Sequence, residues 1–228
     1  MLKALVFDFD GVIADSEPIH HQAFLRLSQA HWQHRFTWQT YVQRYVGFDD
    51  RDAIRTLMAD AGVPAADEAT LAHLIAEKGD HFEAIVRAGV STFPGTVEFI
   101  RQAAAAMPLA IASGATRRDI DLILARLGLA GLFEPIISAD LVHRSKPHPQ
   151  TYHLAVEGLA RRAPALALEP GVCLAIEDTA AGIDSARAAG LPTLALETSS
   201  PHQALLRADR VVPSLEGLSV AQLMAWFA

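Results

Sequence analysis

Short apolar runs alternate with longer amphipathic segments through most of this chain. The runs lie at 2–7, 109–112, 135–138, 172–176, 193–196 and 211–212. Apolar runs of this length, bounded by turn residues, are typical of buried strands in a parallel sheet. Three of them end directly before a polar residue, namely Asp8, Ser113 or Glu177. The pattern therefore predicts strands whose carboxyl ends carry polar side chains.

Helical spacing separates these runs in the second part of the chain. The expected helices are 97–106, 118–127, 149–160 and 180–189. The last is followed by Gly190, a residue that favours the end of a helix. Regular alternation of strand and helix predicts βαβ units. We therefore expect an α/β core, a Rossmann-like parallel sheet with helices on both faces.

Residues 16–90 depart from this alternation and contain no expected strand. Their amphipathic helical segments are 18–30, 38–45, 50–61 and 68–87. Because this stretch follows the first strand directly, the simplest interpretation is an all-helical cap inserted into the core. The predicted domains are an α/β core formed by 1–15 and 91–228, and a helical cap at 16–90.

Composition and charge narrow the class of partner. The chain has 228 residues, 51% of them apolar, with 19 basic and 26 acidic side chains and a net charge of −7. This is the composition of a folded protein, and its acidity argues against nucleic acid or an anionic membrane as the main partner. The single Cys173 excludes an internal disulfide and is expected to be a small buried hydrophobe.

The apolar runs are also too short for a membrane protein. The longest, 103–112, is about half of the roughly 20 residues that a spanning helix needs. The first run is cut off by Asp8 and is too short for the apolar part of a signal peptide. We expect a cytoplasmic protein that is a monomer or a weak oligomer.

Four carboxylates are predicted at the carboxyl ends of the strands: Asp8, Asp10, Glu177 and Asp178. Ligands of open α/β sheets bind beyond these strand ends, and residues i and i+2 of an extended segment point the same way. Gly11 then allows a sharp turn away from the strand. Converging carboxylates repel one another unless a cation lies among them, and an oxygen-only ligand set suits Mg²⁺.

The residue types beside this predicted metal site suggest phosphoryl transfer. Asp8 can attack phosphorus, and Asp10 can protonate the leaving oxygen and later activate water. Ser113 and Lys146 can bind the oxygens of the transferred group. Lys146 is notable because the chain has only three lysines beside 16 arginines, and lysine supplies a compact point charge.

These residues resemble the motifs of the haloacid dehalogenase superfamily in order and spacing. Asp8-Phe9-Asp10-Gly11-Val12 resembles the first motif, and the other three are represented by Ser113-Gly114, Lys146-Pro147, and Glu177-Asp178 with Gly182-Ile183. The resemblance covers essentially the whole chain. It implies that Asp8 is the nucleophile and Asp10 the general acid and base, while the second Asp argues against carbon–halogen cleavage.

The resemblance also implies the ligand sets. Mg²⁺ would be held by Asp8, the backbone carbonyl of Asp10 and Asp178, with Glu177 bound directly or through water. The phosphoryl group would lie against Gly11, Ser113, Gly114 and Lys146.

The predicted cap is similar to that of phosphoglycolate phosphatase-like enzymes and β-phosphoglucomutase. Four of its residues, His20, Gly47, Arg51 and Lys78, match substrate-side positions of that group. Lys78 is equally compatible with an exposed position on a cap helix. Arg51 stands one residue further from Gly47 than in the mutase, and the loop 113–117 has fewer hydroxyl and amide groups.

These departures favour a phosphatase over a mutase. The sequence therefore predicts a Mg²⁺-dependent phosphatase of a small phosphorylated metabolite, a sugar or polyol phosphate. The alternatives are a phosphomutase of the β-phosphoglucomutase type and a catalytically silent binding protein.

Overall fold

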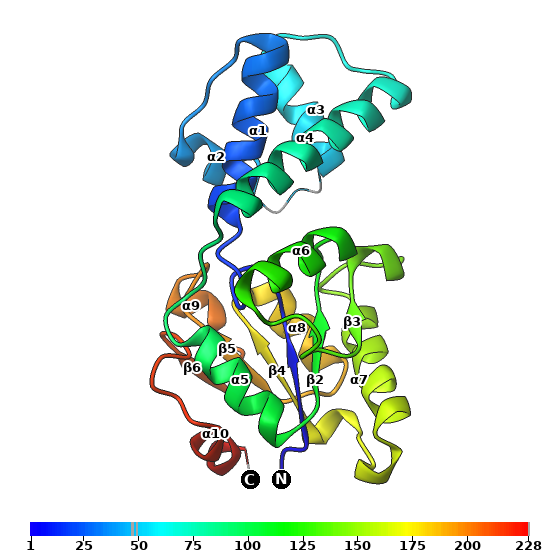
Figure 1. Cartoon of the computed structure of the whole chain (residues 1–228), viewed down its shortest axis with the longest axis vertical. Coiled ribbons are helices and arrows are strands. Elements are labelled where there is room, and N and C mark those ends of the chain that lie inside the picture. Colours follow the sequence, from blue (N-terminus) through cyan, green and yellow to red (C-terminus); the bar gives the residue numbers. More distant parts are fainter. Residues whose placement is uncertain (47, 49, 228) are drawn as a thin grey trace. The chain divides into compact units, whose positions relative to one another are not determined.

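The computed structural model describes residues 1–46, 48 and 50–227, and divides them into two compact units (Figure 1). Met1–Asp15 and the chain from Ser91 form the first unit, and Ser16–Val90 form the second. No helix in the described part of the chain combines the length and the apolar character needed to cross a bilayer.

The first unit is built on a parallel sheet of six strands. The strands are β1 (Ala4–Phe7), β2 (Leu109–Ala112), β3 (Ile136–Ile137), β4 (Cys173–Glu177), β5 (Thr193–Leu196) and β6 (Arg210–Val212). Their order in the sheet is β3-β2-β1-β4-β5-β6. Since the chain extends the sheet from β1 first on one side and then on the other, β1 and its neighbours lie at the switch point where open α/β sheets bind ligands. The predicted α/β fold class is confirmed.

Six α-helices accompany the described strands of this unit: α5 (Thr96–Ala106), α6 (Arg117–Leu127), α7 (Gln150–Arg162), α8 (Ala180–Ala188), α9 (His202–Leu205) and α10 (Val220–Trp226). The sequence pattern predicts the first four and misses the last two. Both missed helices are short, four and seven residues. A reciprocal capping box between Ser219 and Gln222 begins α10.

Alternation along β1 explains how helices cover both faces of the sheet. Ala4 and Val6 pack in one cluster with residues of α7 and α8. Phe7 points to the opposite face, where its ring lies 6.4 Å from that of Phe99 on α5. Cys173 is fully buried in the first of these clusters, as predicted. Because helices cover both faces of the sheet, a ligand can reach it only at the ends of its strands.

The second unit is entirely helical in its described residues. Its helices are α1 (Glu17–Trp32), α2 (Trp38–Arg44), α3 (Asp50–Asp60) and α4 (Glu68–Ala88). Its core gathers apolar side chains from all four, including Phe24, Tyr41, Leu57 and Leu71. Burying these faces together lets the unit form a core of its own.

Lys78 on α4 is buried within this helical unit, at 1% exposure. Its Nζ lies 2.7 Å from Asp50 Oδ1 at the start of α3 and 2.9 Å from His20 Nδ1 on α1. The rings of Phe24 and Phe82 flank the ammonium at 4.9 and 5.2 Å from their centroids. A buried charge requires such partners, so Lys78 joins three helices and is not an exposed lysine.

Candidate active site

Neighbouring strands place the acidic residues of the first and fourth motifs side by side. Asp8 follows β1 directly, and its N–H donates to the carbonyl of Ile176 at 2.9 Å. Phe7 is paired with Ile176 in the parallel register of β1 and β4. Asp8 is therefore level with Glu177, the last residue of β4, and Asp178 comes next.

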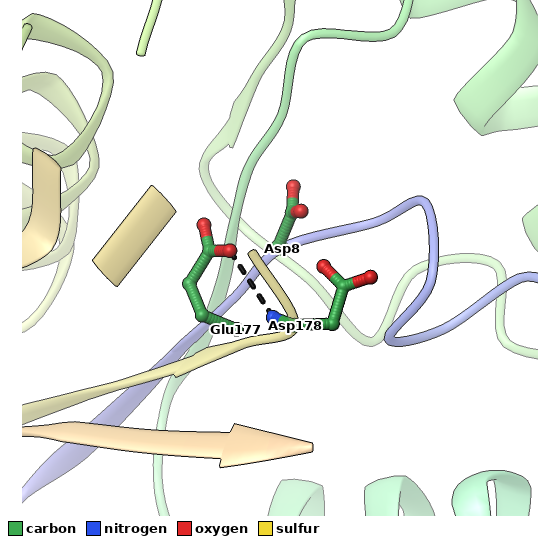
Figure 2. A group of neighbouring side chains, drawn as sticks. All are labelled: Asp8, Glu177 and Asp178. Carbon is green, nitrogen blue, oxygen red and sulfur yellow. Dashed lines mark hydrogen bonds between the residues drawn. The ribbon is translucent and has the colours of Figure 1, made fainter. Parts of the chain in front are cut away.

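The carboxylates of Asp8, Glu177 and Asp178 form one cluster. Each contributes an oxygen, and these oxygens all lie within 4.8 Å of one another. Figure 2 shows the three side chains rising to the same region beyond the strand ends. All three residues are buried, at 8%, 0% and 1% exposure respectively. The convergence expected from the sequence is therefore present for these three carboxylates.

Lys146 lies between two members of the cluster. Its Nζ is 2.8 Å from Asp8 Oδ1 and 2.6 Å from Glu177 Oε1. The lysine side chain is 14% exposed, and the two carboxylates raise its pKa above the usual range despite the opposing effect of burial. Lys146 is thus a permanent positive charge beside the Asp8 carboxylate.

Glu177 is held at both of its carboxylate oxygens. Oε1 accepts from Lys146 Nζ and from the Tyr152 hydroxyl, the latter at 2.7 Å. Oε2 accepts from the Asp178 N–H and the Thr179 hydroxyl, each at 3.2 Å. A fully buried carboxylate with four donors is fixed in place. A cation binding Glu177 directly would compete with these donors, which favours contact through water.

The cluster has an electrostatic cost that a cation would relieve. Burial first, and then the charge of Glu177, raises the pKa of Asp8 to about 7, against a smaller opposing effect of Lys146. Burial, with the charges of Asp8 and Glu177, raises the pKa of Asp178 to about 8. Simultaneous ionisation of Asp8 and Asp178 is therefore unfavourable unless a further positive charge lies nearby.

Asp178 provides a direct indication that the donor set suits a hard cation. Its Oδ1 is buried and has no hydrogen-bond partner among the described residues. The Ser199 hydroxyl hydrogen-bonds to the same carboxylate. Gly11 leaves room for this arrangement, since a Cβ at Gly11 would come within 1.9 Å of Asp178 Oδ2. An unpartnered buried carboxylate oxygen among other carboxylate oxygens fits a hard divalent cation.

Asp10 and Gly11 form the turn that follows Asp8. Asp10 is half-buried, pairs with Ala14 through the backbone, and lies near enough for its charge to raise the pKa of Asp8. Gly11 has a φ of +79°, which favours glycine, and its N–H donates to the carbonyl of Ala14 at 2.9 Å. The turn keeps Asp10 next to the carboxylate cluster.

Ser113 and Gly114 follow β2, the strand beside β1. Ser113 is fully buried, and its Oγ accepts from the Ala115 N–H at 2.9 Å. Gly114 is exposed, with open space where a Cβ would stand. Both residues lie at the carboxyl edge of the sheet that carries the cluster.

The remaining predicted site residues belong to the helical unit. His20 is half-buried on α1 and contacts Lys78, as described above. Arg51 on α3 is half-exposed and forms an ion pair with Glu68 at the start of α4. Gly47 lies outside the described residues. The substrate contacts expected for these four positions therefore stay predictions.

Three residues of the site are missed by sequence reasoning. Tyr152 and Ser199 contact the cluster as described, and the Thr198 hydroxyl donates to the carbonyl of Gly11 at 2.5 Å. Tyr152 is hidden in an ordinary amphipathic helix, and its apolar neighbours suggest only packing. The signal for the other two is positional, because Thr198 and Ser199 follow the end of β5, as the predicted polar residues follow other strands.

The raised carboxyl pKa values predict an inverse pH dependence for the metal-free protein. Asp8 and Asp178 hold protons up to about pH 7 and 8 when folded, but have ordinary values of 3.8 when unfolded. Their stabilising contribution is complete below about pH 4 and is lost as the pH rises through 7 and 8. In EDTA, the melting temperature should fall by several degrees between pH 5.5 and 8.5.

A divalent cation held by this cluster, tested as Mg²⁺, should raise the melting temperature more at pH 8.5 than at pH 5.5, because carboxylates must be ionised to bind a cation. Calorimetry with and without Mg²⁺ measures both effects. The Asp121→Asn variant, which changes an exposed carboxylate of α6, should retain the wild-type profile. A melting temperature in EDTA that is constant or rises over this interval would contradict the assignment.

The parallel sheet of this α/β unit carries a half-buried lysine and three clustered carboxylates at the carboxyl ends of its strands, and comparisons with known proteins identify the family. Residues 2–190 match the family model described as haloacid dehalogenase-like hydrolase. The CbbY protein of Rhodobacter capsulatus is 36% identical over 200 residues, covering 83% of each chain. The chain therefore belongs to the haloacid dehalogenase-like hydrolases.

The chain is also similar to a characterised phosphatase and to the crystal structure of a phosphomutase. The fructose-1-phosphate phosphatase YqaB of Escherichia coli is 29% identical, covering 82% of this chain and 92% of the relative. The crystal structure of β-phosphoglucomutase from Clostridium difficile superposes with a TM-score of 0.79 at 20% identity, covering 100% and 97% of the two chains. The second likeness concerns the fold alone.

Proposed function

We propose that this protein is a Mg²⁺-dependent phosphatase that hydrolyses a small phosphorylated metabolite through an aspartyl-phosphate at Asp8. The observation that carries the proposal is the position of Lys146 between Asp8 and Glu177, together with Asp178 of the same cluster, which has an unpartnered carboxylate oxygen. A nucleophilic carboxylate, a fixed ammonium and a cation-binding oxygen are the components that phosphoryl transfer to a carboxylate needs.

Asp8 and Asp178 would hold the metal ion, together with the backbone carbonyl of Asp10, and Glu177 would reach it through water. When bound, the ion would offset the charge of the phosphoryl oxygens, so that Asp8 could approach an anion. In the same step, Lys146 donates to the phosphoryl group from its position beside Asp8. Ser113, at the end of the neighbouring strand, is assigned to the same oxygens.

The reaction proceeds in two balanced steps. A carboxylate oxygen of Asp8 forms a bond to phosphorus as the bond from phosphorus to the ester oxygen breaks, and Asp10 gives its proton to that leaving oxygen. Asp10 then takes a proton from water, whose oxygen attacks phosphorus and releases inorganic phosphate and the free Asp8 carboxylate. Asp10 ends the cycle protonated, as it began.

The substrate class is proposed to be a sugar or polyol phosphate. The support is the fructose-1-phosphate phosphatase among the relatives, since the core cluster recognises only a phosphate. In the helical unit, Arg51 is the candidate for a substrate contact, because its half-exposed guanidinium pairs with an exposed Glu68 that a substrate anion could replace. Lys78 and His20 are assigned to holding α1, α3 and α4 together around that position.

Release of inorganic phosphate from a panel of sugar phosphates, polyol phosphates, phosphoglycolate and nucleotides tests the proposal. Turnover of at least one sugar or polyol phosphate should require Mg²⁺ and stop in EDTA. No release from any member would overturn the proposal in favour of a binding protein. A further arm supplies β-glucose 1-phosphate with a bisphosphate primer, where glucose 6-phosphate in place of free phosphate would indicate a mutase.

A further inference from the structure

Tyr152 is a buried residue of α7 to which the motifs assign no role. Its side chain has no exposed surface, and its ring packs in the cluster that joins α7 to β1 and β2. Its hydroxyl leaves this apolar cluster and donates to Glu177 Oε1 at 2.7 Å. A purely packing residue at this position would need no hydroxyl.

The contacts around Glu177 Oε1 link the tyrosine to the reacting carboxylate. The same oxygen accepts from Lys146 Nζ at 2.6 Å, and that ammonium lies 2.8 Å from Asp8 Oδ1. The centroid of the Tyr152 ring is 5.1 Å from the ammonium. The Tyr152 ring therefore lies against the lysine, and the Tyr152 hydroxyl and Lys146 share one acceptor oxygen.

We propose that Tyr152 is a positioning residue, whose hydroxyl fixes the Glu177 carboxylate so that Lys146 stays beside Asp8. Glu177 turns about its side-chain bonds unless both oxygens are held, and Oε1 is held by Lys146 and Tyr152. Without the Tyr152 hydroxyl, the Glu177 carboxylate would be more mobile, and Lys146, which donates to it, would be held less firmly. This inference rests on the proposed function, because it concerns the placement of a phosphoryl-binding ammonium.

Two features make the tyrosine suited to this role. The phenol stays protonated, since burial and the charges of Glu177 and Asp8 hold its pKa well above the ordinary value. It is therefore a hydrogen-bond donor near neutral pH. The role is also separable from packing, because phenylalanine keeps the ring and its contact with Lys146.

The test is Tyr152→Phe in the full chain. We expect kcat for phosphate release to fall about 5- to 20-fold, because a small displacement of a group that binds the transition state is costly. KM should change less than about twofold, since the metal ion and Ser113 still bind the substrate phosphate. Tyr45→Phe is the matched control, because it removes a tyrosine-to-carboxylate hydrogen bond, of 2.6 Å to Asp60, within the helical unit.

A second readout does not depend on turnover. The chain has only three lysines, Lys3, Lys78 and Lys146, so protein labelled with ¹³C at lysine Cε gives three signals that Lys3→Arg and Lys146→Arg assign. Tyr152→Phe should shift or broaden the Lys146 signal and leave the other two unchanged. Tyr45→Phe should leave the Lys146 signal in place.

The outcomes separate this inference from the proposed function. A wild-type protein that releases no phosphate overturns the proposed function, while a shift of the Lys146 signal in Tyr152→Phe still supports the positioning role. An unchanged Lys146 signal, or a kcat within twofold of wild type, overturns the role of Tyr152 even when the enzyme is an active phosphatase. An equal loss of kcat in Tyr45→Phe would show that the effect of Tyr152→Phe is one of general stability, and would also overturn the positioning role.

Discussion

Asp8→Asn is expected to lower Mg²⁺-dependent phosphate release at least about 10³-fold. The amide keeps the size of the carboxylate but is a poor nucleophile, so the aspartyl-phosphate no longer forms. The measurement is phosphate release under saturating Mg²⁺, with mass spectrometry of the purified variant to establish that the introduced amide has not hydrolysed back to a carboxylate. Residual activity above about 1% of wild type in intact Asp8→Asn would sink the mechanism.

The same substitution should not destabilise the metal-free protein near pH 8. The dominant effects on the Asp8 carboxylate are burial and repulsion by Glu177, which both favour an uncharged side chain, and only the contact with Lys146 opposes them. In EDTA the variant should therefore melt at the wild-type temperature or above it. Asp121→Asn supplies the control for an exposed carboxylate, with activity and melting both unchanged.

The sheet could be predicted from sequence because its strands are buried on both faces. In the first unit, β1 and β2 consist entirely of apolar residues, as is typical of strands in a parallel sheet covered on both faces. Helices were harder to recognise where the apolar face is short, as in α9, in which Leu205 is the buried residue.

The candidate site was predictable to the extent that its residues end strands. Asp8, Glu177 and Asp178 stand at positions that the apolar runs mark, and their contact follows from the register of β1 with β4. Tyr152 reaches the site from the side of α7, and its spacing from the motif residues along the chain does not indicate this contact. Lys78 was ambiguous in the same way, because its partners Asp50 and His20 come from two other helices.

Gly182 gives the fourth motif a physical explanation that the motif itself does not contain. It lies in the first turn of α8, where its N–H donates to the Thr179 hydroxyl at 3.1 Å. A Cβ at this position would come within 1.9 Å of Glu177 Oε2 and 2.0 Å of Glu177 Cδ. The helix therefore approaches the buried carboxylate so closely that only a residue without a side chain fits.

Gly182→Ala should consequently reverse the ordinary effect of this substitution. In an unobstructed helix, alanine is more stable than glycine by roughly 0.5–1 kcal/mol. Here it must displace Glu177 from its donors, so we expect the free energy of unfolding to fall by roughly 1–3 kcal/mol. Because Lys146 loses the carboxylate that fixes it, kcat/KM should fall at least about 10²-fold.

Gly171→Ala is the matched control, because no atom lies within 4 Å of the place its methyl group would take and its backbone is unstrained. Chemical denaturation gives the free energy, and phosphate release gives kcat/KM. Gly171→Ala should match wild type in both. If the Gly182→Ala variant is instead more stable than wild type and equally active, then displacement of Glu177 affects neither stability nor catalysis. The fixed carboxylate that orders Lys146 and Asp8 would then not be a requirement of the reaction.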